Sequence, residues 1–187
     1  MKTITLAGGC FWGMERLYRA LGVADAVVGY ANGDSAEHAN YPTVCTGDTG
    51  FREAVQITYD PERISLKHLL FVFFGAVDVT MYHRQGMDIG SQYQTGIYWS
   101  DPTDEQEILA IADMEKAGVR EFYVELKPLE CFYDAEEYHQ RYLEKNPAGY
   151  CHLSPMRIGA LTAYPYDEAA YTRPAAVLLQ DYMDKRS

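Results

Sequence analysis

The sequence predicts an α+β domain with a mainly antiparallel sheet and helices packed on it. Strands and helices alternate irregularly along the chain, and two predicted strands follow one another directly, as is typical of this class. Hydrophobic residues make up 48 % of the 187 residues, which is enough for one sizeable core. No apolar run approaches the length needed to cross a bilayer.

The first half of the chain is expected to supply three strands and two helices. Alternating or β-branched apolar runs predict strands, whereas apolar positions on one helical face predict helices. Gly8-Gly9 ends the first strand, Gly22 stops the first helix and Ser65 can cap the second. The expected strands are Thr3–Ala7, Ala26–Tyr30 and Arg52–Tyr59, and the expected helices are Met14–Leu21 and Leu66–Val77.

The second half is expected to supply two strands and three helices. Asp101 followed by Pro102 is typical of a helix start, and Asp134 with Glu137 has the spacing of a capping box. Residues 34–50 and 79–93 are long polar loops, which often carry function. The expected strands are Gly96–Trp99 and Phe122–Leu126, and the expected helices are Asp101–Lys116, Asp134–Lys145 and Pro174–Asp184.

Charge and cysteine usage narrow the class of function. The net charge of −11 would repel nucleic acid and anionic membranes on average. The apolar stretch at the N-terminus is too short for a signal peptide, so we expect the protein in the cytoplasm. None of the four cysteines forms a C-x-x-C pair, which argues against a structural zinc site. In a reducing compartment these thiols are either inert or catalytic.

Cys10 is the first candidate for chemistry. It lies in Gly8-Gly9-Cys10-Phe11-Trp12-Gly13, between a predicted strand and a predicted helix. The N–H groups and the dipole at a helix N-terminus favour thiolate, so we expect a lowered pKa for Cys10. The preceding glycines permit a sharp turn that leaves the sulfur uncovered. A buried, inert cysteine is the alternative that this segment alone leaves open.

Glu53 is the second candidate, because side chains alternate along its strand. It shares a face with Val55, Ile57 and Tyr59, whereas the opposite face is more polar. If the Val55 face is the core face, desolvation raises the pKa of Glu53 and keeps it protonated. A neutral carboxylic acid is what general-acid catalysis needs. A solvated position at a frayed strand end is the alternative.

Other candidates depend on the constellation around them. Asp88 and Tyr93 lie in a polar loop and could face a ligand, or the loop could be an ordinary one. Cys151 follows a segment with the composition of a hinge, as a resolving cysteine requires, or it is a spare thiol. Cys45 and Cys131 are expected to be inert. His139 is interpreted as structural, with the Asp88 loop within its possible reach.

The motif around Cys10 closely resembles the active-site signature of A-type peptide methionine sulfoxide reductases, a repair activity for one sulfoxide epimer. Further matches follow in the same order and spacing, roughly from Gly8 to Cys151. Several separated motifs in one order are more specific than any one alone. They are Gly29-Tyr30-Ala31, Asn40-Tyr41 to Cys45, Thr49-Gly50, Glu53-Ala54-Val55, Arg84-Gln85-Gly86 with Asp88, Gly90 and Gln92-Tyr93, Phe132-Tyr133, Ala135-Glu136, Tyr138-His139-Gln140, Asn146-Pro147 and Gly149-Tyr150-Cys151.

The resemblance implies a two-layer, ferredoxin-like α+β sandwich that reduces the S-epimer of methionine sulfoxide, free or in proteins. It implies residues 1–155 as one catalytic domain and leaves 156–187 as a C-terminal extension packed on or trailing from it. The implied roles are Cys10 as nucleophile, Glu53 as acid, Tyr41 and Tyr93 as donors to the sulfoxide oxygen with Asp88 beside them, and Phe11 with Trp12 as the pocket for the substrate's methyl group.

The reaction cycle expected from these roles needs no metal and no bound cofactor. Cys10 becomes a sulfenic acid, Cys151 converts it to a disulfide, and a thioredoxin-like dithiol reduces that disulfide. Relatives with a third, recycling cysteine carry it in a glycine-rich tail, whereas residues 152–187 contain no cysteine. Cys131 therefore stays open as the resolving thiol. The competing interpretations are another cysteine enzyme, such as a thiol peroxidase or a Cys–His hydrolase, and a binding module with an accidental thiol.

Overall fold

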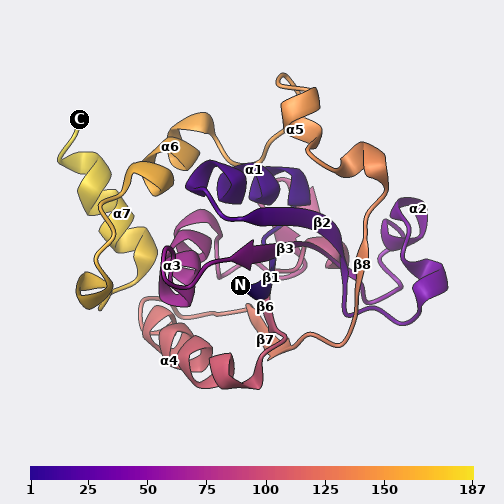
Figure 1. The fold of residues 1–187 in the computed structure, drawn as a ribbon, viewed down its shortest axis with the longest axis horizontal. Coiled ribbons are helices and arrows are strands. Elements are labelled where there is room, and N and C mark those ends of the chain that lie inside the picture. Colours follow the sequence, from indigo (N-terminus) through magenta and orange to yellow (C-terminus); the bar gives the residue numbers. More distant parts are fainter.

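The computed structural model describes residues 1–187 and is built on one six-stranded sheet (Figure 1). The strand order is β7-β6-β1-β3-β2-β8, and every pairing is antiparallel except the one between β6 and β7. This confirms the predicted α+β class with a mainly antiparallel sheet. A separate ribbon pairs β4 (Arg84–Gln85) with β5 (Asp88–Ile89). The sheet strands are β1 (Lys2–Ala7), β2 (Asp25–Ala31), β3 (Arg52–Tyr59), β6 (Gly96–Trp99), β7 (Glu125–Pro128) and β8 (Phe132–Asp134).

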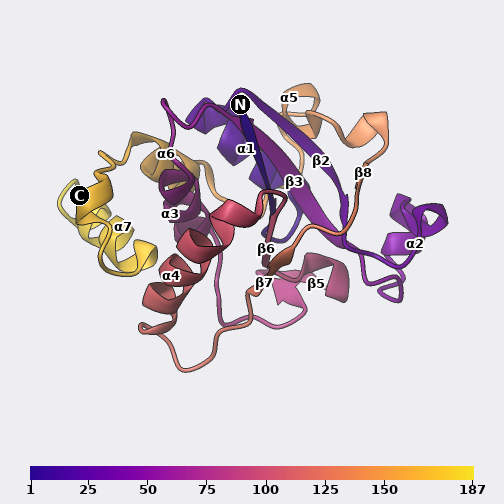
Figure 2. The same cartoon turned by 60° about the horizontal axis from the view of Figure 1, so that its bottom comes forward.

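Two helices cover one face of this sheet and form the second layer of the fold (Figures 1 and 2). They are α1 and α3, which share one apolar cluster with the sheet residues Ile4, Leu6, Val55 and Ile57. The helices are α1 (Phe11–Leu21), α2 (Tyr41–Val44), α3 (Leu66–Ala76), α4 (Glu105–Lys116), α5 (Tyr142–Lys145), α6 (Pro155–Ala163) and α7 (Ala175–Asp184). Single 3-10 turns lie at Ala36–His38, Ser91–Tyr93, Pro102–Asp104, Glu137–His139 and Glu168–Ala170.

The ends of α1 follow from local sequence. Gly9 has a φ of 86°, a left-handed conformation that allows the chain to turn sharply from β1 into the helix. Gly22 has a φ of 92° and its N–H bonds back to the carbonyls of Tyr18 and Arg19, which ends the helix. Between them, Met14, Leu17 and Tyr18 point into the core. The helix is thereby held with its N-terminus at the end of β1.

The predicted helix over Asp134–Lys145 is wrong. Asp134 instead closes β8, where it pairs with Gly29 of β2, so the expected capping box does not form. Arg141 then adopts a φ of 53°, which interrupts any continuous helix. Its N–H donates to both carboxylate oxygens of Glu15, at 3.0 Å each. Tertiary bonds to α1 and β2 therefore override the local helical signal.

Two further differences concern the second half of the chain. The last predicted strand, Phe122–Leu126, begins later in the structure, as β7, and pairs parallel with β6. The helix α6 lies where the sequence pattern weakens, with Ser154 as its N-cap and Pro155 in its first turn. The other predicted strands and helices are confirmed to within a few residues.

The C-terminal helices pack on other helices rather than on the sheet: α6 packs on α1 and α3, and α7 packs on α3 and bonds to α4 (Figure 2). The Arg157 guanidinium of α6 donates to the Gly75 carbonyl at 2.7 and 3.0 Å, near the end of α3. Buried Glu115 of α4 accepts bonds from the Tyr171 hydroxyl at 2.5 Å and the Ala175 N–H at 2.8 Å. The division at residue 155 into catalytic domain and extension stays a prediction. No helix in the structure is both long and apolar enough to span a membrane.

Candidate active site

Cys10 lies at the end of the sharp turn between β1 and α1. Its residue is 7 % exposed, so the thiol is nearly buried but still reachable. It occupies the N-cap position of α1, and the N–H groups of Trp12 and Gly13 point toward its sulfur. The predicted placement of this cysteine at a helix N-terminus is therefore confirmed.

Glu53 lies beside Cys10, although 42 residues separate its strand from the turn. Its Oε1 accepts a hydrogen bond from the Phe11 N–H at 3.2 Å, and the residue is 2 % exposed. Val55, Ile57 and Tyr59 of the same strand belong to the core, which confirms that Glu53 is on the core face. Burial raises the pKa of Glu53 to about 8, against the opposite effect of the Phe11 N–H. Glu53 is consequently protonated at neutral pH.

The expected lowered pKa of Cys10 is wrong for the protein without substrate. Burial raises the pKa of the Cys10 thiol, and the nearby carboxylate charge of Glu53 raises it further. The N–H groups of Trp12 and Gly13 act in the opposite direction but are outweighed. Sequence reasoning weighed the helix N-terminus alone, because burial depends on segments that are distant along the chain.

Tyr41 and Tyr93 come from the two long polar loops and lie near Cys10 and Glu53. Burial raises the pKa of both hydroxyls, and the charges of Glu53 and Cys10 add to this effect in each. Asn40 caps α2 and places Tyr41, whose N–H donates to Glu136 at 3.0 Å. The two phenols are therefore protonated donors that converge on Cys10 and Glu53.

Asp88 of β5 lies close enough to Cys10 and Glu53 for its charge to act on both. Its Oδ2 accepts a hydrogen bond from the Tyr150 hydroxyl at 3.0 Å, and its charge acts on Cys10, Glu53 and Tyr93. Asp88 therefore connects the pocket to the segment that carries Cys151. The charge of Asp88 acts on Tyr93, whereas the roles implied for Asp88 and the two phenols stay predictions.

Phe11 and Trp12 occupy different surroundings. Phe11 is buried in a small aromatic cluster, with its ring 5.8 Å from that of Tyr30 and 5.1 Å from that of His139. Trp12 is half-buried, stacks on Tyr142 at 3.7 Å, and donates its Nε1–H to Nδ1 of His139 at 3.1 Å. His139 thus contacts the aromatic residues of the site and not the Asp88 loop.

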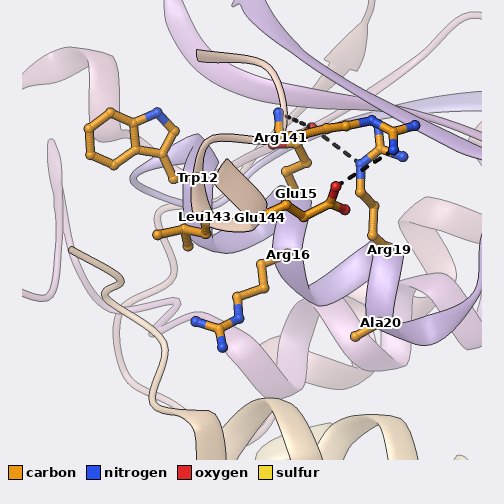
Figure 3. Close-up of a pocket in the computed structure, with 8 residues that line it drawn as sticks. All are labelled: Trp12, Glu15, Arg16, Arg19, Ala20, Arg141, Leu143 and Glu144. Carbon is orange, nitrogen blue, oxygen red and sulfur yellow. Dashed lines mark hydrogen bonds and ion pairs between the residues drawn. The ribbon is translucent and has the colours of Figure 1, made fainter. Parts of the chain in front are cut away.

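Trp12 also lines a cavity of about 310 Å³ on the outer side of α1, which contains neither Cys10 nor Glu53 (Figure 3). In this cavity the Glu15 carboxylate accepts hydrogen bonds from the Arg19 guanidinium and from the Arg141 N–H. The lining residues are Trp12, Glu15, Arg16, Arg19, Ala20, Arg141, Leu143 and Glu144.

The Cys151 sulfur lies against the first turn of α1, directly after Cys10. A Cβ atom at Gly13 would stand 3.3 Å from the Cys151 sulfur, and the Gly13 N–H points toward the Cys10 sulfur. The Cys131 sulfur lies 3.9 Å from the Gly33 carbonyl, in a different cluster. Cys45 is exposed and interacts with Tyr41. All four cysteines are free thiols.

Two residues that border this site were missed by sequence reasoning. Tyr150 bonds to Asp88, and the His152 ring lies against the turn, with Nε2 3.0 Å from the Gly8 carbonyl oxygen. The available signal was that both polar aromatic residues directly flank Cys151 in sequence. The structure contains no group of three or more His, Cys, Asp or Glu side chains that could hold a metal ion.

Comparison with known proteins agrees with this geometry. The family model described as "Peptide methionine sulfoxide reductase" matches residues 2–163. The chain belongs to the peptide methionine sulfoxide reductase family. The MsrA of Clostridium perfringens is 51 % identical over 155 residues, which cover 82 % of this chain and 98 % of that protein. An oxidoreductase activity on methionine sulfoxide is therefore established at the level of the family.

Solved structures of a yeast relative share the fold. Mxr1 of Saccharomyces cerevisiae in reduced form is 42 % identical, with a TM-score of 0.76 over 80 % of this chain and 88 % of that chain. Mxr1 in complex with Trx2 is also similar, with 30 % identity and a TM-score of 0.54 over 75 % of this chain and 84 % of that chain. The lower of these two TM-scores belongs to the structure in which the yeast protein is bound to Trx2.

Proposed function

We propose that this protein reduces the S-epimer of methionine sulfoxide, free or within proteins, with Cys10 as nucleophile and Glu53 as proton donor. The observation that carries the proposal is the hydrogen bond from the Phe11 N–H to Glu53, which brings the carboxyl beside the thiol. A sulfoxide sulfur is electrophilic, but its oxygen leaves only when it is protonated. The reaction therefore needs both groups in one pocket.

In the first half of the cycle, the Cys10 sulfur bonds to the sulfoxide sulfur while Glu53 protonates the oxygen. Tyr41 and Tyr93 donate hydrogen bonds to that oxygen and stabilise its developing charge. The S–O bond then breaks as the hydroxyl group transfers to the Cys10 sulfur, and the S–S bond to the substrate breaks as methionine leaves, so Cys10 becomes a sulfenic acid. Glu53 takes up the proton of the Cys10 thiol in place of the one that it gave. Phe11 and Trp12 hold the substrate's methyl group. The thiol and the sulfoxide together supply all atoms of the two products.

In the second half, Cys151 attacks the sulfenic acid, a disulfide forms, and water leaves. The shared position of both sulfurs around Gly13 supports Cys151 over Cys131. A thioredoxin-like dithiol then reduces the disulfide, as the complex of the yeast relative with Trx2 suggests. A cytoplasmic location fits this need for a reducing partner. Residues 156–187 act as an extension that supports α3 and α4.

The roles can be tested by a single turnover without added reductant. Wild type should release about one equivalent of methionine from the S-epimer and none from the R-epimer. Cys10→Ser should release none. Cys151→Ser should still release about one equivalent and accumulate a sulfenic acid on Cys10, detected by mass spectrometry. Cys45→Ser is the matched control and should behave as wild type. Methionine release by Cys10→Ser would refute the assignment of the nucleophile.

A further inference from the structure

His152 has one ring nitrogen with a partner and one without. Its Nε2 lies 3.0 Å from the Gly8 carbonyl oxygen. A carbonyl oxygen only accepts hydrogen bonds, so Nε2 carries the ring proton and Nδ1 holds a free lone pair. This Nδ1 is buried and makes no hydrogen bond. Buried polar atoms usually have partners, so an unpaired one calls for a physical explanation.

The free lone pair and the second thiol face the same residue. A Cβ atom at Gly13 would stand 2.8 Å from Nδ1 of His152 and 3.3 Å from the sulfur of Cys151. The N–H of Gly13 points toward the sulfur of Cys10. Only a residue without a side chain leaves room for both groups at this point of α1. A base and the two thiols therefore surround one helical turn.

The thiol of Cys151 needs a proton acceptor before it can attack. It donates to the Leu153 carbonyl at 3.0 Å. An ordinary thiol has a pKa of about 8.5 and is a weak nucleophile at neutral pH until it loses its proton. A carbonyl oxygen cannot take that proton, whereas a neutral imidazole nitrogen can.

We propose that Nδ1 of His152 accepts the proton of Cys151 as this thiol attacks the sulfenic acid of Cys10. The proposal rests on the proposed function, because it assumes those two cysteine roles. The S–H bond of Cys151 breaks and the S–S bond forms, while the S–O bond of Cys10 breaks. The leaving hydroxide takes the proton from the imidazolium and departs as water. The sulfenic sulfur is reduced and the thiol sulfur is oxidised to the disulfide level, so no further oxidant or reductant is needed.

The charge state of His152 suits this role. Burial lowers the pKa of His152, whereas the charge of Asp88 and the bond to Gly8 raise it. Two titratable groups lie near the ring: Asp88 of β5, whose charge acts on it, and Cys151, which shares the space at Gly13 with it. The net direction is downward, which keeps the ring neutral and able to accept a proton near neutral pH.

Two variants separate a proton acceptor from a residue that only positions the segment. His152→Gln retains an amide N–H that can donate to the Gly8 carbonyl but has no basic nitrogen. His152→Ala removes both. His68→Gln is the matched control, because His68 is also a partly buried neutral imidazole, stacked on Tyr166 at 4.1 Å, and it lies on α3. All are tested as the full chain in reduced form.

Each protein is mixed with one equivalent of methionine (S)-sulfoxide and quenched with an acidic alkylating reagent. Methionine release and the bridge between Cys10 and Cys151 are followed separately by mass spectrometry over a range of pH. We expect bridge formation, relative to methionine release, to slow by about 10²- to 10⁴-fold in both His152 variants. Its rate should then rise with pH up to the pKa of an unassisted thiol. His68→Gln should match wild type.

The inference is overturned if His152→Gln forms the bridge at the wild-type rate, because a donor to Gly8 would then suffice. It is also overturned if both variants match wild type. These results differ from failure of the proposed function, in which wild type itself would release no methionine or would bridge Cys10 to a different cysteine.

Discussion

At the scale of single residues, burial raises the pKa of both Cys10 and Glu53, because the thiolate and the carboxylate would each lack hydration in a buried site. The carboxylate charge of Glu53 also raises the pKa of Cys10. The resting pair is therefore a neutral thiol beside a neutral acid. In the proposed mechanism, the proton for the sulfoxide oxygen is thus already on Glu53, whereas the thiolate of Cys10 has to form during the reaction.

The raised pKa of Glu53 makes a prediction about stability. Its carboxyl titrates near 4.5 when unfolded and at about 8 when folded, so the folded protein binds more protons between these values. The contribution is fully present below pH 4.5 and is lost as pH rises through 8. The free energy of unfolding of wild type relative to Glu53→Gln should therefore fall over this window, by about 5 kcal/mol, in urea titrations at several pH values.

Glu136→Gln provides the control of opposite sign. Burial alone would raise the pKa of Glu136, but hydrogen bonds from the Tyr41 N–H and other donors lower this pKa below its usual value. Its contribution to stability is present at neutral pH and is lost as pH falls through the lowered folded value. A flat difference between wild type and Glu53→Gln from pH 5 to 8 would contradict the burial of a protonated carboxyl.

Sequence reasoning placed Cys10 at a helix N-terminus and Glu53 on the core face, but it gave the wrong direction for the pKa of Cys10. Strand alternation is a local rule, so it placed Glu53 on the core face correctly. The pKa of Cys10 depends on residues that only folding brings near it, such as Glu53 and Asp88, so the local argument gave the wrong sign. His152 has no motif of its own, because its ring faces Gly13 through a tertiary contact.

At the scale of elements, local signals succeeded where they matched the packing. Gly22 ends α1 as its conformational freedom predicts, and Ser65 caps α3 by accepting the N–H of His68 at 3.1 Å. The capping-box pattern at Asp134 does not form a helix start, because Asp134 pairs with Gly29 of β2 as part of a strand. The sequence of a segment does not reveal which distant strand edge is free to pair with it.

Two glycine positions test how tightly elements approach one another. A Cβ at Gly29 in β2 would stand 2.4 Å from the backbone oxygen of Tyr133, whereas a Cβ at Gly159 in α6 would meet nothing within 4 Å. Gly29→Ala should destabilise the fold by about 1–3 kcal/mol, because β8 must shift. Gly159→Ala should stabilise it by about 0.5–1 kcal/mol through helix propensity. Equal urea midpoints for the two variants would contradict the close pairing of β2 and β8.

At the scale of the whole molecule, one compact frame positions the site. The order β6-β1-β3-β2 with α1 and α3 on one face is the ferredoxin-like arrangement that the family resemblance implied. It brings the end of β1, the start of β3 and the two long loops together. The sequence pattern alone reached the α+β class. The parallel β7 and the place of α6 required the three-dimensional packing.

The C-terminal helices test how far the fold extends. Glu115 of α4 is buried and accepts a bond from the Tyr171 hydroxyl at 2.5 Å. Tyr171→Phe removes this donor and should lower the free energy of unfolding by about 1–3 kcal/mol. Tyr182→Phe, whose hydroxyl donates to Ala163 at 3.3 Å near the surface, is the control and should change stability little. Similar losses of unfolding free energy in both variants would show that the bond from Tyr171 to Glu115 contributes no more to stability than a bond near the surface.

The pairing of a thiol with a protonated carboxyl is tested most directly by the pH dependence of methionine release in a single turnover at low substrate concentration. In wild type the rate should rise with pH, as thiolate forms, and this rise should break near pH 8, where Glu53 loses its proton and the rate levels off. Glu53→Gln should be slower by about 10²- to 10⁴-fold at pH 7, and its rate should continue to rise without that break. A break that survives in Glu53→Gln, or an unchanged rate, would contradict the pairing.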